Sequence, residues 1–324
     1  MQSQKYYVKR FVKDHKFLYQ PLKKVIDWKH AITTSWGDNR QGDSKTLESS
    51  LPKTDPWALR LDASQPGLPF ARFWGNVGYE SFKSGTLASE NRQFFALMQE
   101  ANENRPNTFR YVRAHNLYSN GVSPWGEGCE IYQTDGNGRP SYNWEIMDQV
   151  FDAILAHGLR PIVEFGFMPD ALASDPARRQ KWSKANISPP NDYRRWRDLV
   201  QATVAHLVER YGENEIRQWY FEVWNEPDLG YLFWIEDPDH RPWGDLDEYF
   251  KLYDYTVDGA KRAFPNIQIG GPVSAGLGIG EFMEHAYLRK NYVSGETGSP
   301  VDFVSSHAYG KIHLLEGGKK KKNI

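Results

Sequence analysis

A helix, a glycine, a strand and a polar cluster follow one another in residues 191–228, NDYRRWRDLVQATVAHLVERYGENEIRQWYFEVWNEPD. Apolar residues recur with the 3.6-residue period of a helix at Tyr193, Trp196, Val200, Val204, Leu207 and Tyr211. Asn191 or Asp192 can cap the start of this helix, and Gly212 suits its end. The β-prone run 219–224 then predicts a strand, which the polar run NEPD follows at once. This order is typical of a βαβ unit in a parallel sheet.

The same alternation extends in both directions from this stretch. The candidate strands are residues 72–78, 109–115, 161–167, 219–224, 267–271 and 301–307. Helix-periodic segments separate them, notably 143–157, which Gly158 follows, and 247–264, which Pro265 ends. Strands that alternate with helices in this way permit either an open doubly wound sheet or a closed (β/α)8 barrel.

The glycine pattern and the placement of polar residues favour the barrel. A doubly wound nucleotide-binding sheet carries a glycine-rich turn after its first strand, but GNVG at 75–78 lacks the GxGxxG spacing. Polar and aromatic residues gather instead just after the C-terminal ends of successive strands, where a barrel has its active site. We therefore predict an α/β fold of the (β/α)8 TIM-barrel type, incomplete in this chain with about six βα units.

Composition excludes several classes of function. The chain of 324 residues has 40 Lys and Arg against 41 Asp and Glu, a formal net charge of −1, so neither a nucleic-acid nor a membrane partner is expected. No apolar run reaches the roughly 18 residues of a membrane helix. Residues 1–16, MQSQKYYVKRFVKDHK, lack the apolar core of a signal peptide. The sequence therefore predicts a soluble, cytoplasmic chain, and its lone Cys129 cannot form an intrachain disulfide.

Aromatic residues are abundant, with 12 Trp, 18 Tyr and 17 Phe, and many stand beside carboxylates or amides. Aromatic faces next to hydrogen-bonding groups suit sugar rings, which have C–H faces and polar edges. A core rich in large side chains explains the same composition, so position along the chain must decide between the two.

Four strand ends carry the side chains from which a site can be built. The candidates are His115, Glu164, Phe167, Trp224, Asn225, Glu226 and His307. Taken singly, a histidine at a strand end is usually structural. Glu164 and Glu222 can also simply pair with Arg113 inside the barrel. The agreement among four strand ends nevertheless favours one shared site.

Glycoside hydrolysis gives this set a chemical reason. An acetal needs a carboxylic acid to protonate the leaving oxygen and, in retaining enzymes, a second carboxylate about 5–5.5 Å away as nucleophile. Glu226 suits the acid, Asn225 can bond the sugar 2-hydroxyl, and Trp224 can line the cleft. Without HxxxH, HxH or Cys/His spacing, no metal or cofactor is expected. A GxSxG elbow for a serine hydrolase is missing too.

A series of motifs in chain order resembles glycoside hydrolase family 39, the β-xylosidases and α-L-iduronidases. They are LDAS at 61–64, YVRAH at 111–115, YNW at 142–144, DQVFD at 148–152, FMPDALA at 167–173, WYFEVWNEP at 219–227, GGP at 270–272 and VDFVSSHAY at 301–309. The resemblance implies that Glu226 is the acid/base, that Asn225 precedes it as in the family, and that His115 and His307 line the sugar subsite.

The resemblance also divides the chain. It implies a glycosidase barrel portion at 61–310, a segment at 1–60 that would belong to an accessory β-sandwich, and a Lys-rich tail at 311–324. The family's nucleophile is a glutamate at the end of the seventh strand, and only 17 residues follow His307, too few for two more helix–strand units. Glu316 is therefore not assigned as the nucleophile, which is expected beyond the chain end.

The sequence thus predicts a retaining, β-xylosidase-type hydrolase of a carbohydrate substrate. The alternative is a catalytically silent, sugar-binding chain that lacks the nucleophile. The choice between a xyloside and an iduronide stays open.

Overall fold

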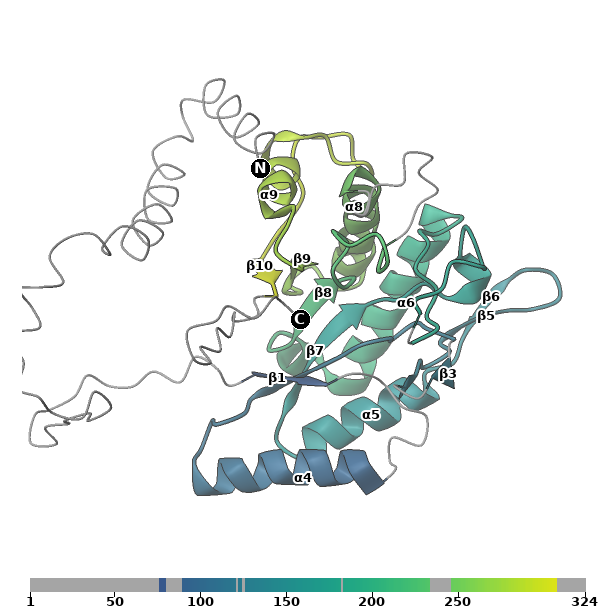
Figure 1. Cartoon of the computed structure of the whole chain (residues 1–324). Helices are drawn as coiled ribbons and strands as arrows, with labels where there is room; N and C mark the ends of the chain where they lie inside the picture. The colour runs from purple at the N-terminus through teal and green to yellow at the C-terminus, as the bar shows by residue number, and fades with distance from the viewer. Residues whose placement is uncertain are drawn as a thin grey trace, which may run out of the picture. The chain divides into compact units, whose positions relative to one another are not determined.

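The computed structural model of the chain describes residues 76–79, 89–120, 122–123, 126–181, 183–233 and 246–307. All of them belong to the second of two units, Ala71–Ile324 (Figure 1). The expected segment 1–60 and the Lys-rich tail 311–324 lie outside the described residues, so the boundaries of these parts stay predictions.

Six parallel strands form the central sheet. They are β1 (Asn76–Tyr79), β2 (Tyr111–Ala114), β7 (Arg160–Phe165), β8 (Tyr220–Val223), β9 (Ile269–Ser274) and β10 (Phe303–Ser306). Each strand of this sheet pairs with the sheet strand that follows it in sequence, in the order β1-β2-β7-β8-β9-β10. A doubly wound sheet reverses its strand order at a switch point, whereas a barrel does not. The prediction of an incomplete (β/α)8 barrel is therefore confirmed.

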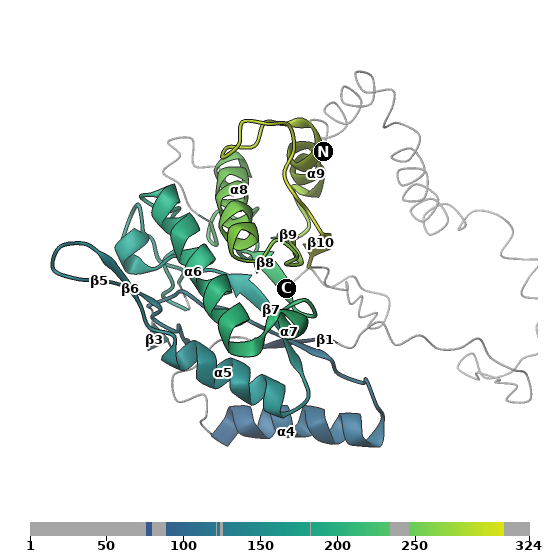
Figure 2. The ribbon, with the colours of Figure 1, turned by 180° about the vertical axis from the view of Figure 1, so that it is seen from behind.

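The helices follow one another around the outside of this sheet (Figures 1 and 2). They are α4 (Ser89–Asn104), α5 (Glu145–Ala156), α6 (Tyr193–Tyr211), α7 (Glu213–Ile216), α8 (Leu246–Ala263) and α9 (Ile279–Leu288), with a 3₁₀ turn η1 at Asp170–Leu172. Asp192 caps α6 by accepting the backbone N–H groups of Arg194 and Arg195, and Gly212 at φ 81° ends it, as the sequence predicts. In the described part of the chain, each helix is too short or too polar to cross a bilayer.

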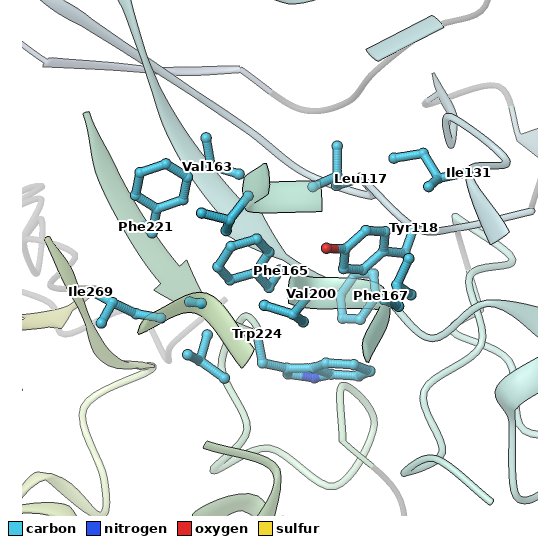
Figure 3. Close-up of a cluster of buried hydrophobic side chains, with 14 of the residues drawn as sticks. Leu117, Tyr118, Ile131, Val163, Phe165, Phe167, Val200, Phe221, Trp224 and Ile269 are labelled. Atoms are coloured by element: carbon cyan, nitrogen blue, oxygen red, sulfur yellow. The ribbon is translucent and has the colours of Figure 1, made fainter. Parts of the chain in front are cut away.

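Large aromatic side chains fill the interior. Figure 3 shows Phe165 of β7 beside Tyr118 and Phe221, and the ring centroids lie 6.2 Å and 5.7 Å apart. Between α6 and α8 the indole Nε1 of Trp196 donates to Thr256 Oγ1 at 2.8 Å. This dense packing holds the strand ends, and the residues that follow them, in fixed positions.

Two short hairpins between β2 and α5 were not expected. They pair β3 (Val122–Ser123) with β4 (Gly126–Glu127), and β5 (Tyr132–Thr134) with β6 (Pro140–Tyr142). The turn of the second hairpin holds DGNG at 135–138, where Asp135 Oδ1 accepts the N–H groups of Asn137 and Arg139. An Asn-Gly or Asp-Gly pair between short β-prone runs is a hairpin signal, so this element was detectable from sequence.

Candidate active site

The chain makes a strained turn directly after β8. Trp224 and Glu226 have φ values of 68° and 48°, which side chains other than glycine rarely adopt. Trp224 N donates to Phe165 O at 3.1 Å and Glu226 N donates to Val273 O at 3.0 Å, so bonds to both neighbouring strands hold the turn. Such conformations cost about 1–3 kcal/mol each and persist where the surroundings fix them.

Aromatic side chains support this turn from within the core. The indole of Trp224 has no exposed surface, and its Nε1 donates to Leu232 O at 2.8 Å. Phe167, only 4% exposed, meets it edge to face at 5.0 Å (Figure 3). The indole of Trp224 is thus covered by protein in this structure, and its expected role in lining a sugar cleft stays a prediction. Phe167 also has little exposed surface with which a sugar could make contact.

Glu226 meets the histidine at the end of β10. Nδ1 of His307 lies 2.7 Å from Oε1 of Glu226, and the two side chains are 26% and 14% exposed. The backbone N–H of His307 donates to Ser274 O at 2.7 Å. The structure thus brings together two of the predicted site residues, which stand 81 positions apart in the sequence.

Arg113 links β2, on which it lies, to β7 and β8. Its Nε donates to Glu222 Oε2 at 2.5 Å, and its Nη2 lies 2.7 Å from Glu164 Oε2. Nη2 also donates to Asn225 Oδ1 at 3.1 Å. Burial disfavours the charge of the guanidinium, but the two carboxylates outweigh burial and raise the pKa of Arg113. The alternative weighed for Glu164 and Glu222, an ion pair with Arg113, is therefore present.

His115 is held by the same cluster. Its Nδ1 lies 2.7 Å from Glu164 Oε2 and its Nε2 lies 3.1 Å from Arg113 Nη1. Because a guanidinium can only donate, Nε2 accepts, and we assign the ring proton to Nδ1, the nitrogen close to Glu164. Both ring nitrogens therefore already have protein partners, and a hydrogen bond from either to a sugar requires one of these contacts to open.

Two further residues hold the strand ends and were not singled out from the sequence. The hydroxyl of Tyr249 on α8 donates to Val223 O at 3.0 Å, at the end of β8. Asp228, two positions after Glu226, accepts backbone N–H groups from the loop after β9. The position of Asp228 inside the NEPD run was a signal, but its partners are Ala275 and Leu277, which no local pattern indicates.

Known proteins resemble this chain over most of its length. The family model "Glycosyl hydrolases family 39" matches residues 57–317. A beta-xylosidase of Geobacillus stearothermophilus is 44% identical over 201 residues, which are 62% of this chain and 36% of that protein. The alpha-L-iduronidase of Homo sapiens is 26% identical over 289 residues, 83% of this chain and 39% of that protein.

A solved structure also resembles this chain. The crystal structure of a monomeric beta-xylosidase from Caulobacter crescentus CB15 superposes with a TM-score of 0.60 at 34% identity, covering 77% of this chain and 45% of that one. The chain thus spans less than half the length of these relatives. The match of the family model extends from before β1 to beyond β10 and includes the whole Glu226 site. The chain belongs to glycosyl hydrolases family 39.

Proposed function

We propose that the chain is a retaining glycoside hydrolase of β-xylosidase type in which Glu226 is the general acid/base. The observation that carries the proposal is the contact of Glu226 Oε1 with His307 Nδ1 at 2.7 Å, at the C-terminal ends of parallel strands. His307 engages one oxygen of the carboxyl group, which leaves Oε2 for the oxygen of the glycosidic bond. A (β/α)8 barrel has its reacting groups at this end of the strands.

In the first step Glu226 gives its proton to the glycosidic oxygen while the bond from that oxygen to C1 breaks and a carboxylate bonds to C1. In the second step the Glu226 carboxylate takes a proton from water, whose oxygen attacks C1 and releases the first carboxylate. Between the two steps Glu226 is charged, and His307 stabilises it by donating a hydrogen bond from Nδ1. The nucleophilic carboxylate is not assigned to a described residue, and Glu316 lies outside them.

Asn225 is proposed to bind the 2-hydroxyl of the sugar. Its Oδ1 accepts from Arg113 Nη2 at 3.1 Å, so the amide is oriented and Nδ2 is the end that can donate to a ligand. Arg113 is itself fixed by two carboxylates. Glu164 is fully buried, so we propose that it acts on the sugar only through Arg113 and His115.

The names of the relatives support a choice of substrate class. The match to a protein named beta-xylosidase reaches 44% identity, against 26% for the human alpha-L-iduronidase. We therefore favour a β-xyloside over an iduronide.

Hydrolysis of a chromogenic nitrophenyl β-xyloside tests the proposal. A version of the chain extended through the expected nucleophile strand should release nitrophenol, Glu226→Gln in it should lose most of this activity, and the matched change Glu281→Gln at an exposed position of α9 should keep it. Binding of xylobiose in calorimetry without any hydrolysis would support the alternative, a catalytically silent sugar-binding protein. Neither binding nor hydrolysis would contradict both.

A further inference from the structure

The segment 273–277, at the end of β9 and in the loop after it, holds both members of the Glu226–His307 pair. Val273 O accepts the backbone N–H of Glu226 at 3.0 Å, and Ser274 O accepts the backbone N–H of His307 at 2.7 Å. Strands β8 and β10 do not pair with each other, because β9 lies between them. The 2.7 Å contact of the two side chains therefore depends on where this segment lies.

Asp228 fastens the segment to the turn that carries Glu226. Its Oδ1 accepts the N–H of Ala275 at 2.9 Å, and its Oδ2 accepts the N–H of Leu277 at 3.1 Å. Between them, the N–H of Gly276 donates to Ser274 Oγ at 2.9 Å. Asp228 is only 2% exposed. Hydrogen bonds to a carboxylate are shorter and stronger than those between neutral groups, so both oxygens hold the loop firmly.

Backbone strain makes this fastening necessary. Glu226 has φ 48° and Val273 has φ 53°, and a β-branched side chain is especially unfavourable at positive φ. The hydrogen bond from Glu226 N to Val273 O joins these two strained residues directly. Strained residues relax when the contacts that fix them are lost, so the loop anchored by Asp228 keeps both in place.

We propose that Asp228 is a positioning residue for the Glu226–His307 pair. It acts through the backbone of 273–277 and does not touch the substrate. This inference rests on the acid/base role proposed for Glu226, because only then does the position of the pair matter for proton transfer.

The test compares Asp228→Asn with the matched change Asp302→Asn in the full chain. Asparagine keeps the size of aspartate but turns an NH₂ group toward one of the two backbone N–H groups. Asp302 Oδ2 accepts the N–H of Ile269 at 2.9 Å, so it fastens the same strand β9 at the opposite end. In both variants a carboxylate that accepts a backbone N–H is replaced by an amide, but only Asp228→Asn makes this change beside Glu226.

The first readout is the nitrogen NMR spectrum of the imidazole of His307 at fixed pH, assigned by its loss in His307→Gln. This signal reports the hydrogen bond to Glu226 and needs no turnover. We expect it to shift in Asp228→Asn toward its position in Glu226→Gln and to stay at the wild-type position in Asp302→Asn. An unchanged signal in Asp228→Asn would overturn the inference, even if the N–H groups of Ala275 and Leu277 exchanged faster.

The second readout is kcat/KM for aryl β-xylosides with good and poor leaving groups, measured in the version of the chain extended through the expected nucleophile strand. Misplacement of the acid should lower kcat/KM about 10- to 100-fold for a poor leaving group and less than about threefold for a dinitrophenyl group, which needs no proton. An equal loss on both would indicate a merely structural role and would overturn the inference. If the extended chain hydrolyses nothing, the proposed function fails, while the His307 signal still decides the role of Asp228.

Discussion

Replacing Arg113 by methionine should destabilise the protein strongly. The substitution removes the guanidinium between Glu164, which is fully buried, and Glu222, which is nearly so. Two carboxylates then remain in the interior without their cation. Breaking a buried ion pair by removing one partner costs about 3–5 kcal/mol, because the remaining charge is left without compensation.

The control is a second arginine with two carboxylate partners. Arg210 lies 2.5 Å from Asp152 and 3.4 Å from Asp148, but its side chain is 38% exposed. An exposed pair contributes about 0–1 kcal/mol, so Arg210→Met should change stability little. For a domain of this size 1 kcal/mol corresponds to about 2–4 °C, so Arg113→Met should lower Tm by roughly 6–20 °C and Arg210→Met by about 4 °C or less.

Thermal and urea unfolding followed by circular dichroism measure both changes. Adding Glu164→Gln and Glu222→Gln to Arg113→Met should restore a large part of the lost stability, because the uncompensated charges are then gone. Equal losses in Arg113→Met and Arg210→Met would refute the argument. So would a triple variant no more stable than Arg113→Met.

Two further predictions concern packing and pH. Gly259→Ala should destabilise the protein by about 1–3 kcal/mol in urea unfolding, because a Cβ there would lie 2.4 Å from a backbone oxygen of α6. Gly280→Ala, with nothing within 4 Å, should be neutral or stabilising by up to about 1 kcal/mol, and a loss as large as that of Gly259→Ala would contradict the packing account. Burial raises the pKa of the Tyr249 and Tyr253 hydroxyls well above 10.0. Since an unfolded tyrosine ionises near pH 10, their contribution to stability is complete below that pH and is lost as the pH rises above it. Part of the phenolate absorbance should therefore appear only together with the loss of the circular dichroism signal, and complete ionisation near pH 10 in a folded chain would be the contrary result.

The fold was predictable because its signals are local. Asp192 caps α6 and Gly212 ends it with the residue types that these positions prefer. Strand β8 then lies within the β-prone run expected at 219–224, with Asn225 and Glu226 just beyond its end. Periodicity, capping and strand-end placement all depend on neighbours in sequence, so residues 191–228 were enough to indicate a βαβ unit, and the polar residues at the other strand ends favoured the barrel.

The contacts within the site were not predictable in the same way. The hydrogen bond from Arg113 to Glu222 joins residues 109 positions apart. The same arginine bonds to His115, so whether the His115 ring is available to a sugar depends on this distant ion pair. Trp224 stands in the right place in the sequence to line a cleft, but the strained turn directs its indole into the core. Which way a side chain points after a strand depends on backbone dihedral angles that no sequence pattern specifies.

The most direct test of the central claim is azide rescue of Glu226→Ala. In a version of the chain extended through the expected nucleophile strand, Glu226→Ala should still form the glycosyl intermediate from a dinitrophenyl β-xyloside, because this leaving group needs no proton. Azide, which needs no general base, should then attack C1, speed turnover and give the β-xylosyl azide, identified by NMR. A wild-type activity that survives Glu226→Ala on all leaving groups, or a variant that azide neither accelerates nor converts to the glycosyl azide, would contradict the assignment of Glu226.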